Sequence, residues 1–178
     1  MKPSLTDALC TRCGLCCDGS LFADVELTGP REAERLEGLG LRIEDDDAES
    51  ELMLLPCAAL KGTRCSVYAH RPACCRTFEC GLLQRTRRGR VSVESALVHI
   101  TEARRRIGAV HRLLESLGDS HPQLPLKERC AELLATEPRG GSTDRRRRTA
   151  LEARLGEVEA LIRAQFLSAE GTGATRAR

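Results

Sequence analysis

The feature of this sequence that most constrains its fold is the crowding of cysteines into its first half. Nine of the ten cysteines lie between Cys10 and Cys80. The segment before them lacks the apolar stretch of a signal peptide. No run of the chain approaches the ~20 apolar residues that span a bilayer. We therefore expect a soluble, cytoplasmic protein, in which dense cysteines serve metals or redox chemistry more often than structural disulfides.

The first cysteine cluster reads Cys10-Thr11-Arg12-Cys13-Gly14-Leu15-Cys16-Cys17. Gaps of two residues let successive thiolates turn back onto one ion in a tight loop, and Gly14 permits the backbone angles that such a turn often needs. Zinc accepts such sulfurs, and iron–sulfur clusters use Cys-x2-Cys-x2-Cys runs. The neighbours Cys16 and Cys17 are harder to fit to one tetrahedral ion, because their side chains leave the backbone in different directions. We expect either that they serve two centres or that one is not a ligand.

The second cluster supplies the remaining thiols of this region. It consists of Cys57, Cys65, the pair Cys74 and Cys75, and Cys80. Its spacings alone indicate no particular site. Added to the first cluster, they bring at least eight thiols into one module, which is enough for two four-coordinate sites.

Taken together, the two clusters resemble a known family. The matching residues are Cys10-x2-Cys13-Gly14-x-Cys16-Cys17, then Pro56-Cys57, then Cys65-Ser66-Val67-Tyr68-x2-Arg71-Pro72-x2-Cys75-Arg76-x-Phe78-x-Cys80. This pattern is similar to that of the YkgJ family of cysteine-cluster proteins, which are described as zinc- or iron-chelating domains. The resemblance covers roughly residues 10–80. It implies metal ligands at Cys10, Cys13, Cys16, Cys17, Cys57, Cys65, Cys75 and Cys80.

The remaining candidates for chemistry receive no catalytic role. Cys74 falls at a variable position of the family pattern, and Cys130 is interpreted as a small hydrophobe on a helix. A similar cysteine signature occurs in flagellin lysine methylases, but this chain shows no Gly-rich cofactor loop, so that activity is not carried over. The four histidines follow no paired ligand spacing. The sequence therefore favours a protein that is not an enzyme.

Composition and charge both favour a metal-organised first half. Aromatic residues make up only 2% of the chain. A small module with little hydrophobic core usually needs disulfides or a bound metal to stay folded. Structural zinc can contribute on the order of 10 kcal/mol to folding. Four thiolates around Zn²⁺ leave a net charge of −2, which needs compensation. We expect nearby arginines to hydrogen-bond the sulfurs, Arg71 and Arg76 before Arg12 and Arg64.

The expected fold is α+β: a small irregular cysteine-rich module followed by a mainly helical half. Residues 1–90 form the predicted module, with short strands within 21–27, 41–43 and 52–55 and one helix between Thr28 and Gly40. Residues 91–168 are predicted to be helical. The three helices are placed at about 92–118, 125–136 and 144–167, and a disordered tail at 169–178. The apolar stripe of the last helix is expected to pack against the first of these three.

The leading functional hypothesis is a non-catalytic protein that chelates zinc or iron through clustered thiolates, with helices that contact a protein partner. One alternative is an iron–sulfur protein that passes electrons to an enzyme. Another is a zinc-dependent nucleic-acid-binding module that uses the run Arg145–Arg148. Nucleic acid is the less favoured partner, because the aromatic residues that stack on bases are missing.

Overall fold

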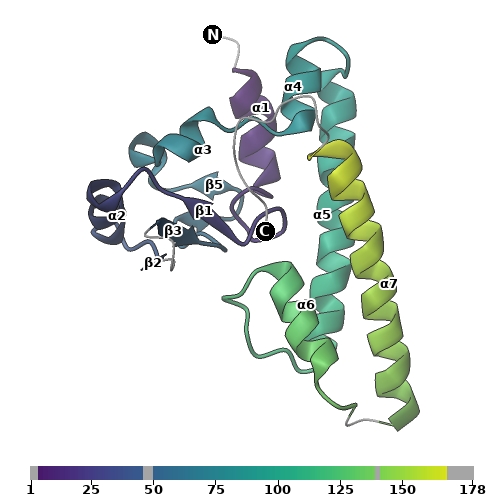
Figure 1. Cartoon of the computed structure of the whole chain (residues 1–178). Helices are drawn as coiled ribbons and strands as arrows, with labels where there is room; N and C mark the ends of the chain where they lie inside the picture. Colours follow the sequence, from purple (N-terminus) through teal and green to yellow (C-terminus); the bar gives the residue numbers. More distant parts are fainter. Residues whose placement is uncertain (1–3, 46–49, 139–140, 168–178) are drawn as a thin grey trace.

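Two groups of elements meet at helix α1 (Leu5–Cys13) in the computed structural model, which describes residues 4–45, 50–138 and 141–167. Short strands and helix α2 (Pro30–Glu37) lie on one side of α1. The long helices α5 (Val93–Ser116) and α7 (Gly141–Gln165) lie on the other side, antiparallel to each other, with the shorter α6 (Leu126–Ala135) beside them (Figure 1). The α+β class predicted from the sequence is confirmed.

The strands form two small sheets near the cysteines. The three-stranded antiparallel sheet has the order β1 (Asp24–Glu26), β3 (Glu51–Leu54), β2 (Ile43–Asp45). The two-stranded sheet pairs β4 (Leu60–Lys61) with β5 (Arg64–Cys65). Met53 of the central strand β3 pairs with Val25 on one side and Ile43 on the other. The strands predicted from the sequence are therefore present, but each is shorter or shifted by one to three residues.

The start of α2 is not capped by Thr28, the residue at which the predicted helix range begins. Gly29 is the N-cap, and Thr28 lies one residue before it. The Thr28 hydroxyl and backbone N–H instead donate to the Glu32 carboxylate at 2.8 and 3.0 Å. A glutamate in the first turn that binds back to the residues before the helix satisfies donors that would otherwise be unpaired. Pro30 occupies the first turn.

Four helical segments of the first half were not predicted. They are α1, the 3₁₀ turn η1 (Tyr68–His70), α3 (Ala73–Thr77) and α4 (Gly81–Arg87). Most are too short to show helical periodicity in the sequence. Residues 87–90, at the end of α4 and just after it, are exposed. Arg85 is only half-exposed, because its guanidinium donates to the backbone and side-chain oxygens of Gln165.

The three helices of the second half are found close to their predicted positions. Ser92 caps α5 by accepting a hydrogen bond from Ser95 N–H. The α7 stripe is buried against α5 and α6, which confirms the expected packing. Its members are Leu151, Leu155, Val158, Ile162 and Phe166.

The basic run at the start of α7 is partly used inside the chain. Arg147 donates to the carbonyl of Ser116 at the end of α5, and Arg148 donates to the carbonyls of Leu133 and Thr136 at the end of α6. Arginines commonly satisfy the last carbonyls of helices in this way. Two of the four arginines therefore hold helix ends together.

Two hydrophobic cores lie on either side of the cysteines. The larger one, called the helical core here, contains nineteen buried residues from the first half as well as from α5, α6 and α7; Leu9, Cys13, Leu15, Leu21, Leu82 and Leu83 are its members before α5. The smaller one, called the sheet core, contains eight buried residues: Val25, Leu27, Ala33, Leu36, Leu41, Met53, Leu55 and Ala59. The helical core thus continues across the predicted boundary near residue 90.

Some sequence-based expectations fall on residues 46–49, 139–140 and 168–178, which lie outside the described residues. Among them is the predicted tail at 169–178. Within the described part of the chain, no helix combines the length and apolarity that a membrane span requires.

A buried ion pair fastens α6 to α5. The Arg129 guanidinium donates to Asp119 Oδ2 at 3.0 and 2.6 Å and approaches His111 Nδ1 at 3.0 Å. Arg129 is only 7% exposed. Because an arginine has no acceptor, His111 must accept at Nδ1 and stay neutral. Burial and the Arg129 cation lower the pKa of His111 below its ordinary value, against smaller opposing effects of Glu115 and Asp119.

We predict that this histidine makes the protein less stable in mild acid. A pKa lowered in the folded state means that the unfolded chain takes up the proton first, so the stabilisation present above about pH 6.5 is lost as the pH falls below it. His111→Asn keeps an acceptor for Arg129 but cannot titrate. Melting temperatures at pH 7.5 and 5.5 should therefore fall more for the native protein than for H111N. Equal falls would show that His111 does not contribute.

Candidate metal centre

The first cysteine cluster lies at the end of α1 and in the turn that follows. Ser4 caps α1 by accepting a hydrogen bond from Asp7 N–H at 3.1 Å. Cys10 and Cys13 are three residues apart on this helix, so their side chains share one face. Gly14 ends the helix in the left-handed conformation at φ +75°, as its sequence position suggested. A turn of helix, rather than an irregular loop, therefore brings the first two thiols together.

Four thiols gather beside the helical core; we call them the α1 group. They are Cys10, Cys13, Cys16 and Cys80. Burial and the neighbouring Cys80 raise the pKa of Cys10 to about 11. Burial and the same Cys80 raise the pKa of Cys16 well above its ordinary value. Cys13, Cys16 and Cys80 all pack against the helical core, so α4 returns Cys80 to the end of α1 from far along the chain.

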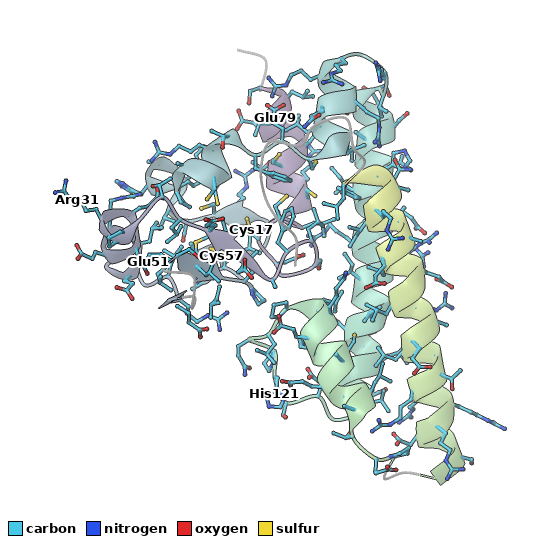
Figure 2. The ribbon with its side chains drawn as sticks, viewed as in Figure 1. Cys17, Arg31, Glu51, Cys57, Glu79 and His121 are labelled. Carbon is cyan, nitrogen blue, oxygen red and sulfur yellow. The ribbon has the colours of Figure 1, made fainter. Side chains whose placement is uncertain are left out.

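The other four thiols gather beside the sheet core; we call them the sheet group. They are Cys17, Cys57, Cys65 and Cys75. Burial, then Cys57 and Cys65, raise the pKa of Cys17 to about 12. Cys57 N–H donates to the Cys17 carbonyl at 2.8 Å, and Figure 2 shows the two residues next to each other. The pKa of Cys75 is raised by Cys74, burial, Cys17 and Cys57.

The eight thiols are gathered without forming a finished coordination cage. All ten cysteines are free, with no disulfide among them. Within residues 4–45, 50–138 and 141–167, no three Cys, His, Asp or Glu side chains already converge as metal ligands. The donor set nevertheless suits zinc or iron, since each group offers four sulfurs and protein ligands commonly close around the ion as it binds.

The two remaining cysteines have different surroundings. Cys74 is next to Cys75 on α3, and a side-chain hydrogen bond between them lowers the pKa of Cys74. Cys130 is fully buried in the helical core, and burial raises its pKa to about 11. The interpretation of Cys130 as a small hydrophobe is confirmed by this placement.

Arginines surround the thiols, though not all are those expected. The Arg71 guanidinium lowers the pKa of Cys10 and of Cys17. Arg42 has the same effect on Cys57, and Arg85 on Cys80, although neither was predicted. Both lie outside the ligand segments, so only the tertiary fold could reveal them. Arg76 instead donates to the Arg71 carbonyl at 2.7 Å.

Comparison with known protein families decides what this arrangement represents. Residues 9–95 match a family model described as "CxxCxxCC: Putative zinc- or iron-chelating domain". This segment is therefore similar to the CxxCxxCC family. The match contains both thiol groups and extends to the first turn of α5. The YkgJ resemblance seen in the sequence is consistent with it. Comparisons with curated proteins and with solved structures gave no match.

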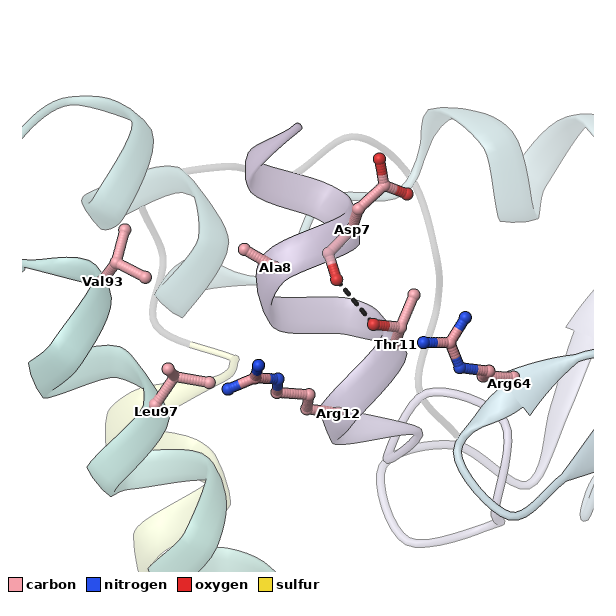
Figure 3. A pocket seen from close by; sticks show the side chains of 7 residues that line it. All are labelled: Asp7, Ala8, Thr11, Arg12, Arg64, Val93 and Leu97. Carbon is pink, nitrogen blue, oxygen red and sulfur yellow. Dashed lines mark hydrogen bonds between the residues drawn. The ribbon is translucent and has the colours of Figure 1, made fainter. Parts of the chain in front are cut away.

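A pocket beside α1 has no cysteine among its lining residues. It has a volume of about 380 Å³ and lies between α1, β5 and α5. Its lining residues are Asp7, Ala8, Thr11, Arg12, Arg64, Val93 and Leu97 (Figure 3). Asp7 lies three residues before Cys10 on α1 and so borders both the pocket and the first thiol. Arg12 and Arg64 border the pocket as well.

A close contact fixes the turn after the cysteine pair. Gly19 has φ +76°, and a Cβ there would lie 3.1 Å from Pro125 Cα and 3.2 Å from Pro56 Cγ. Leu126 N–H also donates to the Gly19 carbonyl at 3.0 Å. Gly19 therefore joins three segments: the turn after Cys17, the loop before Cys57, and the start of α6.

We predict that Gly19→Ala destabilises the domain more than Gly62→Ala does. Both glycines have positive φ, but a Cβ at Gly62 meets nothing within 4 Å. Each substitution should cost roughly 1–3 kcal/mol for backbone strain. Gly19→Ala should cost a further 1–3 kcal/mol or so, because the proline contacts must give way. Thermal and urea unfolding of the two variants provide the measurement, and equal losses would show that the contact is loose.

Proposed function

We propose that this protein binds metal through two four-thiolate centres. The α1 group, Cys10, Cys13, Cys16 and Cys80, holds one centre. The sheet group, Cys17, Cys57, Cys65 and Cys75, holds the other. The bound metal organises the first half of the chain, and the protein performs no catalysis of its own at these sites.

The observation that carries this proposal is the division of the eight cysteines into two sets of four. The neighbours of each thiol come mainly from its own set, and the sets pack against different cores. Four thiolates satisfy one tetrahedral zinc or one cubane iron–sulfur cluster. The family description as a zinc- or iron-chelating domain supports the same conclusion.

The metal supplies cross-links between segments that are distant in sequence. In the α1 group it ties the end of α1 to the start of α4; in the sheet group it ties the turn after α1 to β5 and α3. The nearby arginines Arg42, Arg71 and Arg85 offset the charge that thiolate ligation leaves behind. A protein partner for the helices stays a prediction. Arg147 and Arg148 bind the carbonyls at helix ends, which argues against a nucleic-acid role for the run Arg145–Arg148.

The first test counts metal ions in ligand variants. The native protein, reconstituted with zinc without oxygen, should bind two ions per chain. Cys16→Ser and Cys17→Ser should each lose one ion, and the double variant should lose both, because these sequence neighbours serve different centres. Cys130→Ser provides the matched control and should retain two ions. Mass spectrometry of the metal content gives the count, and a single ion lost identically in all three ligand variants would contradict two centres.

A second test removes the metal. Chelation should abolish hydrogen-exchange protection first around β1, β3 and α2, because the sheet core has only eight buried residues and depends most on cross-links. Helices α5 and α7, within the larger helical core, should keep more protection. Unchanged protection after verified metal removal would refute the organising role.

The same ligands suit an iron–sulfur centre, so the metal itself needs a direct measurement. Protein purified without oxygen should be examined by elemental analysis and visible spectroscopy together. Zinc without colour identifies structural zinc sites. A brown protein with iron, sulfide and reversible bleaching on reduction identifies the electron-transfer alternative.

A further inference from the structure

The pocket of about 380 Å³ between α1, β5 and α5 contains no cysteine and is not used by the two proposed metal centres. Residues of α1 form its floor, and Val93 and Leu97 of α5 form an apolar wall. Arg64 of β5 lies on the opposite side (Figure 3). The volume falls in the lower part of the range of pockets that hold small molecules. The pocket is therefore a candidate binding site of its own.

Direct contacts hold the walls of this pocket in place. The Thr63 hydroxyl, in the turn between β4 and β5, donates to the Thr11 carbonyl at 2.6 Å. A Cβ at Gly14 would lie 3.3 Å from Thr63 Cα, so this turn packs directly on the end of α1. On the other side, Arg104 Nη1 of α5 donates to the Cys13 carbonyl at 2.7 Å. The pocket is thus formed before a ligand enters, which lowers the entropy cost of binding.

Two arginines bring positive charge to this pocket. Arg12 points from α1 toward Leu97, and Arg64 points from β5 toward Thr11 (Figure 3). Among the residues that the structure describes, neither guanidinium forms a hydrogen bond or an ion pair. The Thr11 hydroxyl is already used, since it donates to the Asp7 carbonyl at 2.5 Å. The donors left for a ligand are therefore the two guanidiniums.

The charge balance of the lining selects the kind of anion. Arg12 and Arg64 carry two positive charges and Asp7 carries one negative charge, so the lining has a net charge of +1. The Asp7 carboxylate accepts a hydrogen bond from the Ser4 hydroxyl at Oδ2, at 2.7 Å. This carboxylate repels a dianion such as phosphate more strongly than it repels a monoanion. A guanidinium also matches a carboxylate through two parallel hydrogen bonds.

We propose that this pocket binds a small monocarboxylate whose body is a short apolar chain. The carboxylate accepts hydrogen bonds from the arginines, and the apolar chain packs on Val93 and Leu97. A single arginine on an open surface is solvated and needs no partner. Here two arginines from separate elements border one hollow that also has an apolar wall. A concave apolar surface with a few polar groups is typical of small-molecule sites.

The test is an NMR titration of the full chain, reconstituted with zinc, with hexanoate as the probe. Backbone amide signals of α1 and of the first turns of α5 should shift and saturate with a Kd of about 1 mM, as expected for a ligand of this size. 1-Hexanol has the same apolar chain without the charge, and inorganic phosphate has the charge without the chain. Both should bind at least about tenfold more weakly, because each keeps only one of the two contacts.

Variants separate binding in the pocket from a general attraction of anions. Arg64→Gln should weaken hexanoate binding about tenfold, and Arg64→Lys less, because it keeps the charge but not the paired hydrogen bonds. Leu97→Ala should weaken it severalfold through lost apolar contact. Arg146→Gln is the matched control, since Arg146 is an exposed arginine at the start of α7. It should change the affinity by less than about twofold, because salt screens a distant exposed charge.

Several outcomes would overturn the proposal. They are shifts that grow linearly without saturating, an equal affinity for 1-hexanol, tighter binding of phosphate than of hexanoate, or an equal loss in Arg146→Gln. The amide spectrum of each variant also shows whether it is folded. If Arg64→Gln does not fold, Arg64→Lys and Leu97→Ala still decide. None of these results depends on the number of bound metal ions, so the pocket and the two proposed centres are tested separately.

Discussion

The peptide bond between Cys16 and Cys17 is the constraint on which the rest of this structure depends. Side chains of consecutive residues leave the backbone in different directions, so two neighbouring thiols cannot easily face one ion. Here Cys16 packs against the helical core, while Cys17 lies with Cys57 beside the strands. One short segment therefore belongs to both halves of the protein. Leu15 and Leu21, which flank it, are buried in the helical core and hold it in place.

Charge explains why this fold surrounds its sulfurs with arginines. Burial alone raises the pKa of most of these thiols, which disfavours the thiolates that a metal requires. Three arginines lower these pKa values again. Arg42 lies just before β2, Arg71 in the turn before α3, and Arg85 on α4. A metal ion would remove most of the remaining cost, because it replaces the protons and screens the thiolates from one another. The arginines and the ion would thus both lower the free-energy cost of forming buried thiolates.

The sequence predicted the elements that are long enough to show a periodic pattern of apolar residues. The helical spacing of apolar residues located α5 and α7. The cysteine spacings, read with the family resemblance, predicted eight ligand thiols, and that ligand set stays a prediction. They did not show how those thiols divide, because Cys80 joins Cys10 and Cys13 only through the return of α4 to α1. Arg42 and Arg85 were missed for the same reason: tertiary packing, not spacing, brings them to the sulfurs.

The C-terminal end of α7 contacts the start of α4, beside the thiol of Cys80. Gly81 N–H, directly after Cys80, donates to the Phe166 carbonyl at 2.8 Å, and Phe166 is almost fully buried. Arg85, one turn later, binds Gln165. The last turn of α7 therefore holds the start of α4, and with it the thiol that completes the α1 group. Because α7 is antiparallel to α5 and α5 packs against α1, the two long helices form a frame whose ends fix Cys80 relative to Cys10 and Cys13. If the two proposed centres form, the helices are part of the scaffold of one of them, whereas the sheet group, with the smaller core, would depend on its metal for the same rigidity.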